Sequence, residues 1–146
     1  MKSCGSHPEV QRECLVAVGS LAYKCDGRKA RLMNLGAGEA VVAALANHLT
    51  LSKVQEEGLW SAGNLSAGSE ALKVQFFNQH VSLAVLRSLS AHRGNASVQK
   101  TGLICIGNMS NGSDPRCGVL MAQGAGVACV SALTRHAHNV DVQAYG

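Results

Sequence analysis

The sequence predicts an all-α protein built as a solenoid, in which units of three helices stack along one axis. The first observation is a period of 44 residues, marked by a Val-Gln dipeptide that recurs without insertions. The second is the helical spacing of apolar residues within each period, and the third is the lack of any strand-like alternation. One such unit cannot cover its apolar faces, whereas stacked neighbours bury them in a continuous core.

The period is visible in several columns of the sequence. The dipeptide occurs at residues 10–11, 54–55, 98–99 and 142–143. The same step relates three further columns: Leu15, Leu59 and Leu103; Gly19, Gly63 and Gly107; and His48, His92 and His136. We therefore predict a single domain over residues 1–146, with repeat phases 10–53, 54–97 and 98–141 and a fourth copy that starts at 142.

Each period is expected to hold three helices in the same order. The first begins at Val-Gln and carries apolar residues at helical spacing, which in the middle copy are Val54, Leu59, Ala62 and Leu65. A short second helix is predicted over Ala30–Leu35, Lys73–Gln79 and Val119–Gln123. A glycine break precedes the third helix, except in the middle copy, where we expect Ser82 to be the N-cap.

Composition is that of a globular protein without a membrane span. Hydrophobic residues make up 47% and aromatic residues only 3%, so the core must consist of Leu, Val, Ala and Met. No apolar stretch is long enough to cross a bilayer, and we expect no membrane insertion. The net charge is only +4, and the one dense basic run, which contains Arg28, Lys29 and Arg31, is typical of a solvated helix face. We expect no nucleic-acid partner, because aromatic residues are not interleaved with these charges.

The start of the chain and its six cysteines indicate an intracellular, cytoplasmic protein with reduced thiols. No residues indicate catalysis, a cofactor or a metal. Glu56 and Glu57 are sequence neighbours and do not face each other on a helix, and no H-E-x-x-H motif occurs. The histidine column cannot ligate one zinc ion, because helices of successive units lie roughly 10 Å apart. We expect these histidines to stabilise helix C-termini, and the recurring glycines to mark close helix approach.

The segment from Gly58 to Ser66, with the sequence GLWSAGNLS, resembles the third helix of an armadillo repeat. Together with the period, it makes essentially the whole chain similar to the armadillo family, which includes importin-α and vacuolar protein 8. The resemblance implies a right-handed superhelix of the armadillo/HEAT type that serves as a non-enzymatic scaffold for other proteins. It adds the nucleus and the cilium as alternative locations.

The resemblance also implies a binding groove along the opening helices. Trp60 and Asn64, one turn apart, match a Trp-Asn pair that often lines this groove in the family. Trp60 would form a wall for Lys or Arg stems, while the amides of Asn64 and Asn108 would bond an extended peptide. The alternatives are a core Trp and amides that bond neighbouring helices. The same stripe contains Arg12, Val16, Ser20, Glu56, Glu57, Lys100 and Ile104.

The leading hypothesis is a scaffold that binds an extended peptide or a partner helix along this groove. Recognition of a basic peptide, as by importin, is an alternative, although only the middle copy has both Trp and Asn. A further alternative is a structural module that associates end to end through its terminal helices. The apolar segment Val127–Leu133 would lack a covering helix, so we expect a fragment of a longer solenoid or a pairing with another copy.

Overall fold

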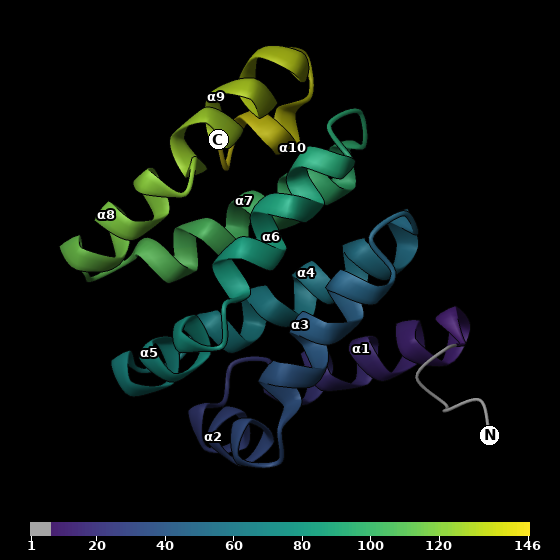
Figure 1. Ribbon diagram of the computed structural model, residues 1–146, viewed down its shortest axis with the longest axis vertical. Coiled ribbons are helices and arrows are strands. Elements are labelled where there is room, and N and C mark those ends of the chain that lie inside the picture. Colours follow the sequence, from purple (N-terminus) through teal and green to yellow (C-terminus); the bar gives the residue numbers. More distant parts are fainter. Residues whose placement is uncertain (1–6) are drawn as a thin grey trace.

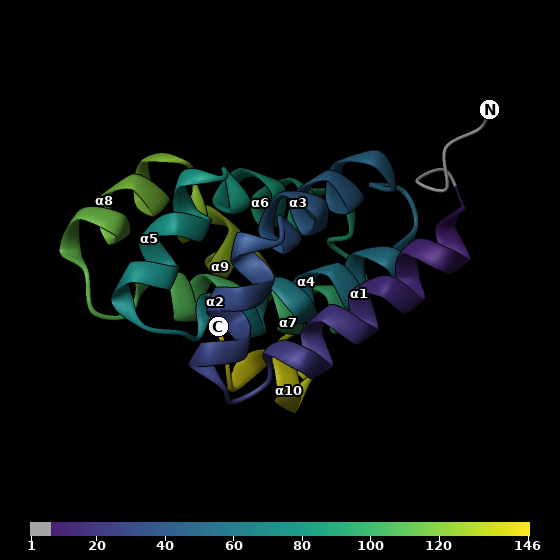
Figure 2. The same cartoon turned by 90° about the horizontal axis from the view of Figure 1, so that it is seen from below.

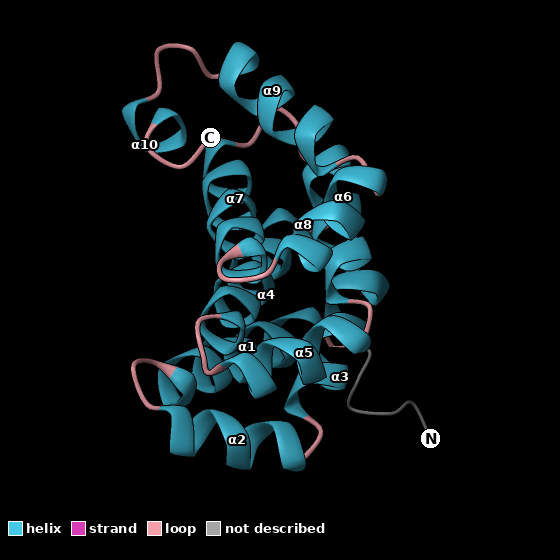
Figure 3. Ribbon diagram, turned by 90° about the vertical axis from the view of Figure 1, so that its left-hand side faces the viewer, coloured by secondary structure: helices cyan, strands magenta, loops and turns pink. Residues whose placement is uncertain are grey.

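The computed structural model describes residues 7–146, and every regular element in that range is a helix, as Figure 3 shows. The prediction of an all-α protein is therefore confirmed. Ten helices follow one another within these residues (Figure 1): α1 (Pro8–Ala22), α2 (Asp26–Asn34), α3 (Ala37–Asn47), α4 (Ser52–Ser66), α5 (Glu70–Asn78), α6 (Val81–Ala91), α7 (Ala96–Ser110), α8 (Asp114–Ala122), α9 (Ala125–Arg135) and α10 (Val140–Gln143).

The helices recur in three lengths. Helices α1, α4 and α7 have 15 residues each, α2, α5 and α8 have 9, and α3, α6 and α9 have 11. The long helices start two residues before each Val-Gln dipeptide. The 9-residue helices also start earlier than predicted, at Asp26, Glu70 and Asp114. Ser69 and Ser113, which precede two of these helices, are N-caps, and serine is equally common in turns, so the sequence pattern alone does not mark the helix starts.

The helices lie in two layers with a row of short helices at one edge. Helix α4 packs between α1 and α7, and α6 packs between α3 and α9. The layers face each other, because α3 contacts α4 and α6 contacts α7. Figures 1 and 2 show the two layers, and the short helices α2, α5 and α8 lie along the left edge in Figure 1.

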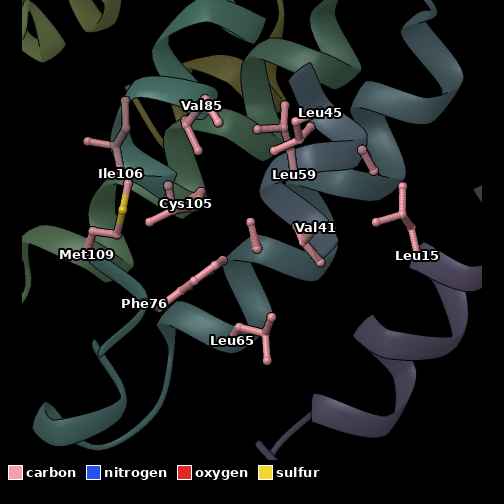
Figure 4. Packing of buried hydrophobic residues seen from close by; sticks show 14 of the residues in the cluster. Leu15, Val41, Leu45, Leu59, Leu65, Phe76, Val85, Cys105, Ile106 and Met109 are labelled. Atoms are coloured by element: carbon pink, nitrogen blue, oxygen red, sulfur yellow. The ribbon is translucent and has the colours of Figure 1, made fainter. Parts of the chain in front are cut away.

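The hydrophobic core fills the space between the two layers. Leu45 of α3, Leu59 of α4 and Val85 of α6 are all buried in it, as Figure 4 shows. Cys105 of α7 belongs to the same core, and burial raises the pKa of its thiol to about 12. The core is therefore aliphatic, apart from a few residues such as Phe76.

Close helix approach explains some of the recurring glycines. A Cβ atom at Gly58 would lie 2.6 Å from Cδ2 of Leu45, and one at Gly102 would lie 2.5 Å from Cδ2 of Leu89. Both distances are far shorter than a carbon–carbon van der Waals contact. The expectation is confirmed at these two positions. It is wrong for Gly107, where an added Cβ would meet nothing within 4 Å.

The Val-Gln dipeptide closes the end of the preceding helix. Nε2 of Gln55 donates to the carbonyl oxygens of Leu45 and His48, each at 2.9 Å, at the C-terminal end of α3. These carbonyls lack partners within their own helix. Gln99 at the end of α6 and Gln143 at the end of α9 make the same two bonds. The valine beside each glutamine is buried, at Val54, Val98 and Val142.

Two members of the histidine column bond loops that lie 43 residues earlier in the chain. A ring nitrogen of His92 lies 2.6 Å from the carbonyl oxygen of Leu49, and one of His136 lies 2.8 Å from that of Arg93. These acceptors lie in the loops after α3 and α6. All three histidines stand at helix C-termini, as C-caps of α3, α6 and α9, but the ring bonds of His92 and His136 go to a loop and not to their own helix, and Nε2 of His48 has no hydrogen-bond partner among the described residues.

The break before α6 differs from its two counterparts. His80 has a φ of +62°, the left-handed conformation that Gly36 and Gly124 adopt before α3 and α9. This conformation costs a residue with a side chain roughly 1–2 kcal/mol. The expectation that Ser82 is the N-cap is wrong, because His80 is the N-cap and Ser82 is buried in the first turn of α6.

Candidate binding groove

Trp60 lies on the face of α4 that meets α1. A Cβ atom at Gly19 of α1 would lie 2.3 Å from Cζ3 of the indole, so only glycine leaves room for the ring. The Trp60 side chain nevertheless keeps 36% of its surface exposed. One part of the indole therefore packs on α1, and the other part is open to a ligand.

Asn64 and Asn108 bond the preceding long helix. Nδ2 of Asn64 donates to the carbonyl oxygen of Gly19 at 3.2 Å, and Nδ2 of Asn108 donates to that of Gly63 at 2.9 Å. Both asparagines are half-buried. The amide nitrogens thus make the internal bonds that were the alternative to peptide binding, and they hold α1, α4 and α7 in register.

A cavity of about 440 Å³ lies where α4, α7 and the loop before α10 meet. Four residues assigned to the groove from the sequence line it together, namely Glu56, Trp60, Lys100 and Ile104. The remaining lining residues were not singled out beforehand: Ala96, Ser97, Thr101, Asn139 and Asp141. The repeat could have found Asp141, because it precedes the fourth Val-Gln dipeptide directly.

The cavity contains charges of both signs. Nζ of Lys100 lies 3.1 Å from Oδ2 of Asp141, and Nζ of Lys53 lies 3.3 Å from Oε2 of Glu56. Lys53 is largely exposed, so its pair with Glu56 contributes little. Glu56 is therefore the carboxylate most available to a ligand in this cavity.

The other groove residues lie outside this cavity. On α1, Arg12 pairs with Glu9 and Glu13, while Val16 is half-buried and Ser20 is exposed. Glu57 of α4 is half-buried and does not line the cavity. The structure thus brings together part of the stripe expected from the sequence and leaves the α1 residues on the adjacent helix.

A second cavity, of about 370 Å³, lies between α6 and α9 and was not predicted. Its lining includes Leu86 of α6 and both Val127 and Ser131 of α9. Val127 is 77% exposed, which agrees with the expectation of uncovered apolar surface along this segment of α9. The sequence indicated the apolar stretch but not the hollow beside it.

No family model, characterised protein or solved structure matches the chain. Among residues 7–146, no three His, Cys, Asp or Glu side chains are grouped to hold a metal ion. Within the same range no single helix is long and apolar enough to cross a membrane. Helices α8 and α9 reach that length and hydropathy only when taken together, and they are bent by 71°. Function has to be argued from the groove itself.

Proposed function

We propose that the chain is an armadillo-type solenoid whose three-helix units stack in a right-handed superhelix. The recurring order of 15-, 9- and 11-residue helices supports this proposal. The glutamine bonds, which recur at the ends of α3, α6 and α9, and the histidine bonds at the ends of α6 and α9 also support it. Units of this size and content are typical of armadillo and HEAT proteins.

The proposed function is non-enzymatic binding of a protein, as an extended peptide or a helix, along the α1–α4–α7 layer. One observation carries it: the cavity gathers Glu56, Trp60, Lys100 and Ile104 from two helices 44 residues apart in sequence. A cavity that combines an aromatic ring with a few charges offers both contact area and orientation. The Asn bonds argue for binding through side chains rather than through these amides.

The best ligand group is a basic side chain. The open part of the Trp60 indole can stack on an Arg or Lys, which contributes about 0.5–2 kcal/mol. Glu56 lines the same cavity and supplies the opposite charge. The positive charge of Lys100 is offset by Asp141, so it does not repel a cation at full strength.

The test is binding of the chain to an array of extended peptides that carry one central Arg, beside matched peptides with Ala or Glu there. We expect the wild-type chain to retain the Arg peptides best. Trp60→Ala and Glu56→Lys should each remove this preference, with affinity falling about 3- to 30-fold. Circular dichroism checks that the variants stay helical.

Tyr23→Ala serves as the matched control, because Tyr23 is a second exposed aromatic residue that lies outside the cavity. It should bind as the wild type does. Equal binding of Arg, Ala and Glu peptides, or equal losses in Tyr23→Ala and Trp60→Ala, would contradict the proposed site.

We also propose an intracellular location. The five cysteines among the described residues are free thiols, namely Cys14, Cys25, Cys105, Cys117 and Cys129. Cys4 lies outside the described residues. Free thiols are typical of the reducing cytosol and nucleus. The expectation that nucleic acid is not a partner stays a prediction.

A further inference from the structure

An ion pair joins two neighbouring short helices in the middle of the molecule. Arg116 of α8 holds both carboxylate oxygens of Glu70, the first residue of α5, and its Nη2–Oε2 distance is 3.0 Å. The same arginine donates from Nε to the carbonyl oxygen of Met109 at 2.8 Å and from Nη2 to that of Asn111 at 3.1 Å. Its side-chain hydrogen bond holds the pKa of Glu70 below the ordinary value.

Arg28 repeats half of this arrangement at the beginning of the molecule. Its Nε donates to the carbonyl oxygen of Leu21 at 2.7 Å, and its Nη2 donates to that of Tyr23 at 3.0 Å. These acceptors precede Arg28 by seven and five residues, as the acceptors of Arg116 do. Arg28 is exposed and pairs with no carboxylate among residues 7–146. Its guanidinium is thus fixed in the geometry of Arg116, with the carboxylate missing.

The matching carboxylate lies at the opposite end. Asp114 is the first residue of α8, as Glu70 is of α5, and it stands 44 residues later. Asp114 is exposed and pairs with no cation within residues 7–146. The two halves of a Glu70–Arg116 pair are therefore present on separate end faces of one chain.

The first turn of α1 is a second copy of α10. In α10, Asp141 pairs with Lys100, Val142 is fully buried, and Gln143 bonds the end of α9. In α1, the residues Glu9, Val10 and Gln11 give the same sequence of acid, valine and glutamine, 132 residues or three periods earlier. Val10 is 50% exposed and has no such pocket.

The third helices offer a further match. In the contact between α3 and α6, Val42 and Ala84 line one hollow, and Leu86 and Ala128 line its counterpart between α6 and α9. The next pair in this series would join Val130 of α9 to a residue 44 positions after Ala128. Three periods before that position stands Ala40 of α3. Val130 is 63% exposed, and Ala40 on α3 is also exposed.

We propose that the chain associates head to tail, with α1 of one copy taking the place of α10 in another. Arg28 of the first copy then pairs with Asp114 of the second, and Ala40 faces Val130. One offset of three periods satisfies all of these contacts at once, and this shared register favours a second copy as the occupant. The contact is heterologous, so it adds copies in a row rather than closing a pair.

Helix α10 limits this association, because it occupies the site that α1 would enter. It has only four residues and buries one side chain, Val142. The 15-residue α1 would instead pack along α7, as α4 packs along α1 and α7 along α4. Displacement of α10 therefore exchanges a small contact for a large one.

The first test is sedimentation velocity of the full 146-residue chain over a wide concentration range. We expect Val142→Asp to expel α10 and to strengthen self-association at least about tenfold. The double variant, which carries Val10→Asp as well, should lose this gain. The Val10→Asp single variant is the matched control, because it places the same charge at the equivalent residue, which is half exposed and does not support the fold. The inference is overturned if the single and double variants sediment alike.

The second test reverses the charges in the Val142→Asp chain. Asp114→Arg should weaken association at least about tenfold by placing two cations together, and a further Arg28→Asp should restore it. Thermal unfolding verifies that each variant is folded. Association that ignores position 28, or that persists in Val10→Asp, would mean that the α9 faces meet each other instead, and the head-to-tail inference would be wrong. Peptide binding at Trp60 is measured separately and does not affect this outcome.

Discussion

At the scale of single residues, several side chains bond a backbone carbonyl that lies 43 to 46 residues earlier in the chain. Asn64 and Asn108 each bond a glycine carbonyl on the preceding long helix, and the Trp60 indole covers one of those glycines, Gly19. A glycine at such a place both exposes its carbonyl and leaves room for the ring. Replacing a glycine by alanine should therefore raise or lower the free energy of unfolding, depending on whether the new Cβ atom has free space or meets a packed side chain.

Two glycines of α7 provide a matched pair for this prediction. Gly102→Ala should lower the free energy of unfolding by about 1–2 kcal/mol, because the new Cβ would clash with Leu89 and outweigh the gain in helix propensity. Gly107→Ala should raise it by up to about 1 kcal/mol, since nothing lies within 4 Å of the new Cβ. Urea denaturation measures both. Equal shifts of the same sign would contradict the packing of α7 on α6.

At the scale of elements, the sequence identified the repeating helices better than their limits. The Val-Gln column was visible because one glutamine makes the same two bonds at each third helix. The starts of α5 and α8 lie earlier than predicted, because their N-caps Ser69 and Ser113 belong to a residue type that favours turns as well as caps. Ser82 was misplaced because a left-handed His80 is unusual and propensity favours a serine cap.

The glutamine bonds can be tested by comparing a buried and an exposed member of the column. Gln99→Ala should lower the free energy of unfolding by about 1–3 kcal/mol, because it removes the side-chain donor of the Leu89 carbonyl in the interior, whereas the His92 carbonyl keeps its bond from Asn95 N. Gln143→Ala removes the same two bonds at an exposed site, where water replaces them, and should cost under about 1 kcal/mol. Similar losses in calorimetry would show that burial is not the deciding factor.

At the scale of the whole molecule, each helix packs mainly on a few neighbouring helices. Helix α4 lies between α1 and α7, whereas α10 packs mainly on α7 and α9. The sequence predicted that the chain is all helical, and the structure confirms this for residues 7–146. It could not predict which groove residues meet in one cavity, because Glu56 and Lys100 come together only through the spacing of α4 and α7. For the same reason it could not choose between the two roles of Asn64 and Asn108.

Hydrogen exchange of the backbone amides should report this gradient. We expect α4 to exchange slowest, because it has packed helices on both sides, and α10 to exchange fastest among the helices. Mass spectrometry of peptides from the exchanged chain gives the comparison. Uniform protection from α1 to α10 would mean that the molecule opens only as a whole.

The bonds between units have a consequence for how this sequence can evolve. His92, His136, Asn64, Asn108 and Ser61 each bond a backbone carbonyl that lies 43 to 46 residues earlier, at positions such as Leu15, Leu49 and Arg93. A carbonyl accepts a hydrogen bond whatever side chain its residue has. Leu49 and Arg93 already differ in chemistry while accepting the same bond. The loops that contain these residues can therefore change in sequence while the bonds that hold the helices together are kept.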